Sequence, residues 1–213
     1  MASYRAPAAE SQAEIREKGS RFLAVIGPAA DEAAARAALE ALARRHPDAT
    51  HHCWAWRLGS PPRERSSDAG EPAGTAGVPI LQVLRGAGLS DVQAVVVRWF
   101  GGVKLGKGGL ARAYAAAARE AVQGLPVVAR VPTARIAVEV PYERVGAVKR
   151  LIRPPEVELE REDYGTSARL SLIVHEERLE ALREALAELG AGRLYTLAPE
   201  VRSIRSKGVV SDE

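Results

Sequence analysis

The stretch "RWFGGVKLGKGGLARAY" (residues 98–114) joins the strongest predicted strand of the sequence to a predicted helix. The strand, residues 92–100, is an apolar run of the kind that is buried on both faces, and the helix extends from about 109 to 123. The glycine loop between them nearly matches a nucleotide-binding loop, but the position that needs Ser or Thr for magnesium is Gly108. The stretch therefore predicts a strand, a glycine loop and a helix, and Gly108 argues against nucleotide hydrolysis at this loop.

Two interpretations of this loop remain open. Glycines allow a tight turn with positive φ angles and close backbone packing. Alternatively, free N–H groups at the start of a helix, together with nearby basic side chains, form a surface that binds phosphate or a nucleic-acid backbone. The candidate anion or nucleic-acid contacts are Arg98, Gly101, Gly102, Lys104, Gly106, Lys107, Gly108, Gly109 and Arg112.

A second glycine-rich stretch, "SDAGEPAGTAG" (67–77), carries the carboxylates Asp68 and Glu71. Two carboxylates three residues apart can bind a metal or act as acid and base. They do not complete a magnesium site without substrate phosphates, and we predict neither metal nor cofactor. The alternative is a loop folded on itself, in which Asp68 and Thr75 cap free N–H groups.

The stretch "HHC" lies on a predicted strand, residues 50–58, where His51 and Cys53 share one side. A His and a Cys on one side are typical of an activated thiolate nucleophile. However, Cβ atoms two residues apart on a strand are separated by roughly 6–7 Å, and cysteine is usually a small buried hydrophobe. We therefore assign no catalytic residue to this sequence.

Composition is that of a globular protein. Of 213 residues, 46% are hydrophobic and 27% charged, enough for one large domain or two small ones. The single cysteine excludes an internal disulfide and zinc sites built from several cysteines. No apolar run approaches the roughly 20 residues that span a bilayer, and no signal peptide is evident. We expect a cytoplasmic protein with no membrane partner.

Charge is unevenly distributed along the chain. Residues 1–132 contain 17 Lys and Arg against 12 Asp and Glu, whereas residues 133–213 contain 13 against 15. The first half therefore has a net charge of +5 and the second half of −2. This distribution indicates that an anionic partner contacts the first half.

The periodicity of the chain predicts two domains. The first, residues 1–130, has strands at 12–18 and 20–27, a helix at 31–45, a long connection at 59–77 and a helix at 78–86. The stretch 124–132 is predicted to link it to the second domain, 133–205, and 206–213 to be a flexible tail. The second domain alternates as βαββαβ, the ferredoxin-like pattern. Its elements are expected at 134–140, 142–152, 156–164, 167–174, 176–189 and 193–201.

The two glycine-rich stretches together resemble the signature of the IMPACT/YigZ family, and "KGSRF" (18–22) and "ATHHCWAW" (49–56) fit its other blocks. The motifs cover about residues 15–123, and the second half fits the bacterial two-domain form by pattern. One departure is Ala69, where the family usually has a second Asp. The signature falls on His51, Cys53, Asp68, Gly70, Glu71, Gly74, Thr75, Gly77, Arg98, Gly101, Gly102, Lys104, Gly106, Gly108, Gly109 and Tyr114.

The resemblance implies an α+β protein. The first domain would resemble domain 2 of ribosomal protein S5, and the second would be ferredoxin-like and resemble a module of elongation factor G. It also implies a link to translational control. We therefore hypothesise a non-enzymatic regulator that binds RNA or a ribosome-associated protein through the 101–109 loop. The alternatives are an enzyme acting on a phosphorylated small molecule, with Asp68 or Glu71 as base, and a protein–protein module. The sequence does not set the oligomeric state.

Overall fold

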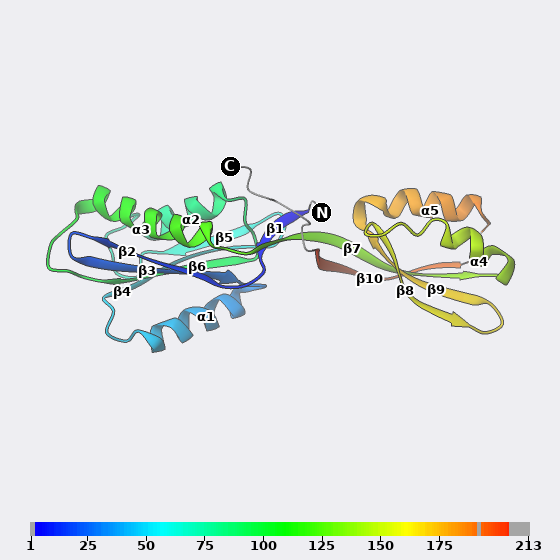
Figure 1. Ribbon diagram of the computed structural model, residues 1–213, viewed down its shortest axis with the longest axis horizontal. Helices are drawn as coiled ribbons and strands as arrows, with labels where there is room; N and C mark the ends of the chain where they lie inside the picture. Colours follow the sequence, from blue (N-terminus) through cyan, green and yellow to red (C-terminus); the bar gives the residue numbers. More distant parts are fainter. Residues whose placement is uncertain (1–2, 191–192, 205–213) are drawn as a thin grey trace. The chain divides into compact units, whose positions relative to one another are not determined.

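The computed structural model describes residues 3–190 and 193–204. The described residues divide into two compact units, Tyr4–Ala129 and Arg130–Ile204. Each unit contains an antiparallel sheet with helices packed against it (Figure 1). The predicted α+β class is confirmed.

The sheet of the first unit has the strand order β2-β3-β6-β4-β5, and every neighbouring pair is antiparallel. Helices α2 and α3 cover one face of this sheet and α1 covers the other (Figure 1). The strands are β2 (Ser11–Glu17), β3 (Ser20–Pro28), β4 (His51–Leu58), β5 (Arg63–Ser67) and β6 (Val92–Trp99). The helices are α1 (Glu32–Arg45), α2 (Gly77–Gly86) and α3 (Gly106–Gln123).

Burial of β6 on both faces is confirmed. Val92 and Val96 pack into the core beneath α2 and α3, while Val95 and Val97 pack towards α1. Successive strand residues point to opposite faces, so a strand between two helical layers needs apolar residues at nearly every position. The run "AVVV" within this strand satisfies that requirement.

Helix α1 begins one residue after the predicted start, with Asp31 as its N-cap, and ends at Arg45 as predicted. The Asp31 carboxylate accepts a hydrogen bond of 2.8 Å from the Ala34 N–H, an N-cap that satisfies one free donor of the first turn. Arg44 and Arg45 lie in the last turn, where positive charge is favourable for the helix dipole.

Two strands were not predicted. β5 occupies part of the connection 59–77, and β1 (Tyr4–Pro7) precedes β2. β5 has the polar sequence "RERSS" because it is an edge strand that pairs only with β4 in this sheet. Helix α3 begins at Gly106, three residues before the predicted start, so the end of the glycine loop forms the first helical turn.

The second unit has the predicted βαββαβ order, with strands arranged β10-β7-β9-β8. Pairs β7–β9 and β8–β9 are antiparallel, and α4 and α5 pack on a core that includes Val148, Leu172 and Leu186. This is a ferredoxin-like arrangement. The elements are β7 (Val127–Val140), α4 (Tyr142–Lys149), β8 (Val157–Tyr164), β9 (Ala168–His175), the 3-10 turn η1 (Glu176–Arg178), α5 (Leu179–Glu188) and β10 (Arg193–Ile204).

The predicted link at 124–132 differs from the structure. Strand β7 already begins at Val127, and the division between the two units falls inside it, after Ala129. The predicted flexible tail, 206–213, lies outside the described residues.

Candidate functional site

Arg98 is the next-to-last residue of β6 and belongs to a row of residues that crosses three strands. It pairs with Phe22 on β3 and with His51 on β4. All three side chains belong to the face covered by α2 and α3, because Phe22 packs in that core. Arg98 is only 5% exposed, so the sheet presents a buried cation to the loop that precedes α2.

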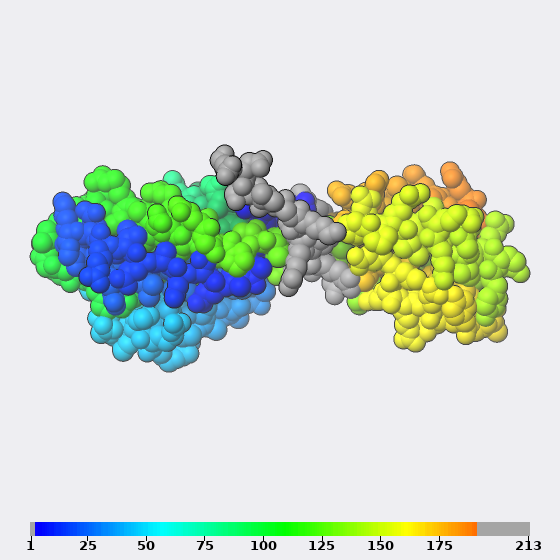
Figure 2. Space-filling view, in the orientation of Figure 1, coloured from blue at the N-terminus to red at the C-terminus, as the bar shows by residue number. Residues whose placement is uncertain are grey.

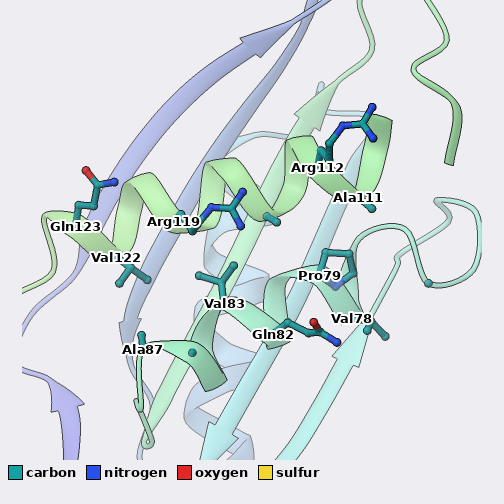
Figure 3. Close-up of a pocket in the computed structure, with 13 residues that line it drawn as sticks. Val78, Pro79, Gln82, Val83, Ala87, Ala111, Arg112, Arg119, Val122 and Gln123 are labelled. Carbon is teal, nitrogen blue, oxygen red and sulfur yellow. The ribbon is translucent and has the colours of Figure 1, made fainter. Parts of the chain in front are cut away.

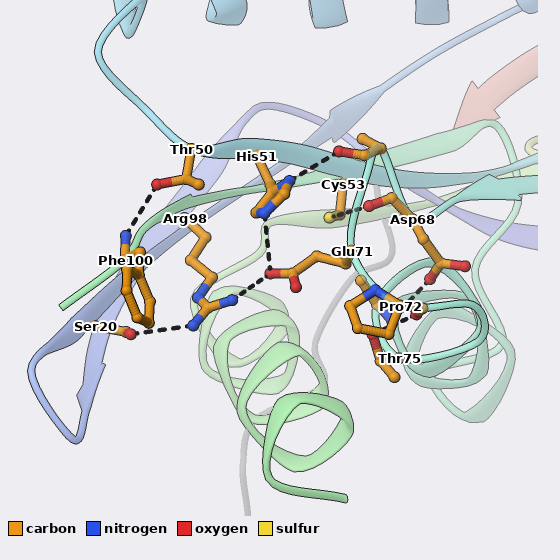
Figure 4. A network of polar contacts seen from close by, with 12 residues as sticks. Ser20, Thr50, His51, Cys53, Asp68, Glu71, Pro72, Thr75, Arg98 and Phe100 are labelled. Atoms are coloured by element: carbon orange, nitrogen blue, oxygen red, sulfur yellow. Dashed lines mark hydrogen bonds and ion pairs between the residues drawn. The ribbon is translucent and has the colours of Figure 1, made fainter. Parts of the chain in front are cut away.

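Glu71, from the 67–77 loop, supplies the opposite charge. Its Oε1 lies 2.6 Å from Arg98 Nη1 (Figure 4). The same oxygen accepts a hydrogen bond of 2.7 Å from the Tyr114 hydroxyl of α3. His51 Nε2 is 3.9 Å from the same oxygen. Both Glu71 and Arg98 are buried, so this pair holds the loop, the sheet and α3 together.

Asp68 caps the start of α2. One carboxylate oxygen accepts from the N–H groups of Ala76 and Gly77, both at 2.9 Å, and the other accepts from Gly74 N–H at 2.8 Å. Burial acts to raise the pKa of Asp68, but these three backbone donors outweigh it and the pKa is lowered. The Thr75 hydroxyl donates to the Pro72 carbonyl at 2.6 Å. The interpretation of a loop folded on itself is therefore correct for Asp68, whereas Thr75 bonds to a carbonyl and does not cap an N–H group as predicted.

Cys53 is fully buried beneath the same loop. Its Sγ donates to the Asp68 carbonyl at 2.9 Å and lies 3.3 Å from the Tyr114 hydroxyl. Burial raises the pKa of Cys53 to about 12. His51 directs Nδ1 towards the Ala69 carbonyl at 2.9 Å, and a carbonyl only accepts, so Nδ1 carries the proton. The pair therefore lacks the thiolate that nucleophilic chemistry requires.

The glycine loop is held against the turn between β2 and β3. A Cβ atom on Gly101 would lie 1.9 Å from the carbonyl carbon of Gly19, so only glycine fits there. Ser20 Oγ accepts from Gly101 N–H and from Arg98 Nη2, both at 3.2 Å. Arg98 therefore connects the two predicted loops, through Glu71 on one side and Ser20 on the other.

Beyond Gly101 the loop faces solvent. Residues 102–104 and 106–108 are exposed, and α3 starts without a side-chain cap or an acidic residue in its first turn. Gly102 and Gly106 have φ angles of +86° and +70°, which disfavour other residues. Gly108 differs, because a Cβ there would meet only the mobile end of Arg112, at 3.4 Å. Its own packing therefore does not require glycine.

The basic residues of the loop divide into two groups. Arg98 is buried and forms an ion pair with Glu71, so its charge is compensated inside the protein. Lys104, Lys107 and Arg112 form no ion pair with any part of the chain that the structure describes. Helix α3 continues from this loop beside β2, and both are exposed on one face of the first unit (Figure 2).

A groove of about 790 Å³ extends from the same region between α2 and α3. Arg112 and Arg119 line it from α3, and Val83 and Gln82 line it from α2 (Figure 3). Gly74, in the 67–77 loop, also borders the groove. Within residues 3–190 and 193–204, no cluster of three His, Cys, Asp or Glu side chains that could hold a metal is found.

The sequence predicts both loops but not the contacts that connect them. Arg98 was predicted as an anion contact, and no role was predicted for Ser20 or Tyr114, although both fall in blocks that resemble the family. The pairing of strands supplies the connection, because it sets Arg98 beside His51 and Phe22. None of the described helices is long and apolar enough to span a membrane.

The fold and site define a two-domain α+β protein with linked glycine-rich loops. Residues 18–122 match the model of the Impact N-terminal domain, and residues 138–193 match a domain of unknown function, DUF1949. The chain is 34% identical to "IMPACT family member YigZ" of Escherichia coli (strain K12) over 203 residues, which cover 94% of this chain and 100% of the relative. The chain therefore belongs to the IMPACT family, and the predicted resemblance is confirmed.

The chain is also similar to other proteins and solved structures. "IMPACT family member in pol 5'region" of Thermus thermophilus is 43% identical, covering 83% of this chain and 96% of the relative. A crystal structure of a hypothetical protein is 33% identical with a TM-score of 0.66, covering 94% of this chain and 98% of the other. The two-domain translational regulator Yih1 is 28% identical over 55% of this chain and 48% of its own, with a TM-score of 0.39.

Proposed function

We propose that this chain is a translation-linked regulator that binds RNA phosphates through residues 102–109 and Arg112. Translational control is what resemblance to the IMPACT family implies. The observation that carries the RNA contact is the combination of an exposed, uncapped helix start with three cations, Lys104, Lys107 and Arg112, that lack ion pairs among the described residues. Such a surface attracts phosphate through both N–H groups and positive charge.

Gly108 supports the same proposal. Glycine in a helix costs about 1 kcal/mol relative to alanine, and the packing around Gly108 gives no compensating steric reason for it. A bare backbone at this exposed position lets a ligand approach the N–H groups of the first turn closely. The amides of Phe100 and Gly101 donate to Thr50 and Ser20 and do not take part.

The enzyme alternative receives less support from the geometry. It needs Asp68 or Glu71 as a base. Asp68 accepts three backbone hydrogen bonds, and Glu71 Oε1 is occupied by Arg98 and Tyr114. Neither carboxylate is therefore placed to accept a proton from a substrate without first losing these partners.

The test is the salt dependence of RNA binding. Fluorescence anisotropy with a labelled single-stranded RNA compares the wild type with a Lys104→Ala, Lys107→Ala double variant. If each lysine contacts one phosphate, the slope of log affinity against log salt falls by about 1.4, since a single strand contributes about 0.7 per contact. Binding to purified ribosomal subunits, followed by cosedimentation, tests the link to translation in the same two proteins.

The matched control is Arg44→Ala with Arg45→Ala, which removes the same charge from the exposed end of α1 on the other face of the sheet. This control retains the wild-type slope if the contact is local. Equal affinities and equal slopes for wild type and the lysine variant would refute the proposal.

A further inference from the structure

A second, smaller cavity lies on the other face of the sheet, between α1 and strands β4 and β6. Its volume is about 170 Å³, and its lining includes Trp54, Trp56 and Gln93 from the sheet with Arg36 from α1. Strand register explains the arrangement: Gln93 on β6 lies opposite Trp56 on β4. The sheet thus presents a carboxamide beside two indoles. This cavity shares no residue with the glycine loop.

Gln93 is the buried polar residue in the lining of this cavity, which also includes the less buried Glu32, Arg36 and Arg65. It is 4% exposed, and its Oε1 has no hydrogen-bond partner within the described residues. On its other side the register places Gly27, and the Glu10 side chain lies over that glycine, 3.7 Å from where a Cβ atom would be. Leaving a buried acceptor unpaired is unfavourable. Gln93 Oε1 is therefore free to accept a hydrogen bond from a ligand in the cavity.

The size and walls of the cavity select a flat ring. A cavity of roughly 150 Å³ accommodates one aromatic ring, so 170 Å³ admits a single ring more readily than a fused pair. Indole faces stack on nucleobases whatever their sequence. The glutamine amide offers one acceptor and two donors. It therefore complements a ring that carries an N–H or amino donor beside an acceptor, which is the pairing edge of a pyrimidine base.

Charge around the cavity favours an anionic group on the same ligand. Arg36 forms no ion pair with the residues that the structure describes. Arg65 lies 3.4 Å from Glu32, and Glu32 is also 3.1 Å from Arg63. The single carboxylate among these groups is thus shared by two arginines, and the net charge at this edge remains positive.

We propose that this cavity binds a pyrimidine nucleotide, with the base against Trp54 and Trp56, its donor on Gln93 Oε1, and the phosphate near Arg36. Two ligands can offer this combination of base and phosphate: a free pyrimidine nucleotide, and a pyrimidine nucleotide within RNA. A neighbouring hollow of about 360 Å³ also borders Gln93 and contains Arg45, but it has no aromatic side chain in its lining. Base stacking therefore assigns the ligand to the cavity with the tryptophans.

The experiment is a titration followed by tryptophan fluorescence and isothermal calorimetry. The probes are UMP, uridine, inorganic phosphate and a short oligouridylate. We expect UMP to quench fluorescence and bind more tightly than uridine, and phosphate alone to produce no quenching. Gln93→Met keeps the side-chain length and removes the acceptor, and it should weaken UMP binding at least about tenfold. Tight binding of the oligouridylate with weak binding of UMP identifies RNA as the source, and the reverse identifies the free nucleotide.

Matched variants make the outcome decisive. Arg36→Gln should lower the affinity for UMP but not for uridine, whereas Arg45→Gln, the same change at the neighbouring hollow, should leave both unchanged. The lysine double variant of the glycine loop should bind UMP normally, so failure of the RNA proposal does not affect this test. Absence of saturable UMP binding up to about 10 mM, or equal binding by a folded Gln93→Met variant, would overturn the proposal and leave a water-filled cavity.

Discussion

Arg98 and Glu71 form a buried ion pair, with Nη1 and Oε1 2.6 Å apart, although they are 27 residues apart in the sequence. Arg98 is the next-to-last residue of the central strand and Glu71 belongs to the loop before α2. The pair therefore fixes one predicted loop on the strand from which the other begins.

Removing the cation of this pair should be strongly destabilising. Arg98→Met leaves the Glu71 carboxylate buried without its partner, at a cost of about 3–5 kcal/mol in the free energy of unfolding. Adding Glu71→Gln removes the stranded charge, so the double variant should be more stable than Arg98→Met alone. Urea unfolding measures both values.

The matched control for this pair is Arg161→Met, which breaks an exposed ion pair with Asp163. It should change the unfolding free energy by less than about 1 kcal/mol. If the losses of unfolding free energy caused by Arg98→Met and by Glu71→Gln simply add in the double variant, the two side chains are not coupled.

Gly101 and Gly108 should respond in opposite ways to alanine. At Gly101 the new Cβ would overlap the backbone of Gly19, so Gly101→Ala should cost about 2 kcal/mol or more. At Gly108 the new Cβ meets a movable arginine, and helix propensity should make Gly108→Ala neutral or more stable by up to about 1 kcal/mol. Urea unfolding decides stability, and anisotropy with RNA should show weaker binding for Gly108→Ala. Unchanged RNA affinity in that variant would remove Gly108 from the proposed contact.

Asp68 should make the free energy of unfolding depend on pH in the acidic range. Its pKa is lowered in the folded protein, so its contribution is complete above the pKa of the unfolded chain, about 3.9, and is lost as the pH falls through the folded value. Asp68→Asn keeps one acceptor oxygen and should cost about 1 kcal/mol at neutral pH. The difference in unfolding free energy between the two proteins should narrow below about pH 4. A constant difference from neutral pH to acid would show that the carboxylate charge is not responsible.

Cys53 should be inert in the native protein. Because burial raises its pKa to about 12, almost no thiolate forms at pH 8. Labelling with iodoacetamide, followed by mass spectrometry, should be negligible in buffer and complete in denaturant. Cys53→Ser provides the unlabelled reference. Stoichiometric labelling of the folded chain would contradict the burial of this thiol beneath the 67–77 loop.

Local pattern predicted most elements of this protein because their signals lie in adjacent residues. Helix α1 carries its own cap and terminal charges, and β6 is apolar at nearly every position. Strand β5 escaped prediction because "RERSS" has no buried face to produce a pattern, and only its pairing with β4 makes it a strand.

The sequence by itself determined that two glycine-rich loops flank a buried strand, that the second half is ferredoxin-like, and that the family signature is present. Only the tertiary structure decided that Arg98 is internal while Lys104 and Lys107 remain exposed, and that Gln93 lies beside two tryptophans. The physical reason is that charge and burial depend on partners from distant segments. Strand register, which brings residues such as His51 and Arg98 side by side, is set by packing of the whole sheet.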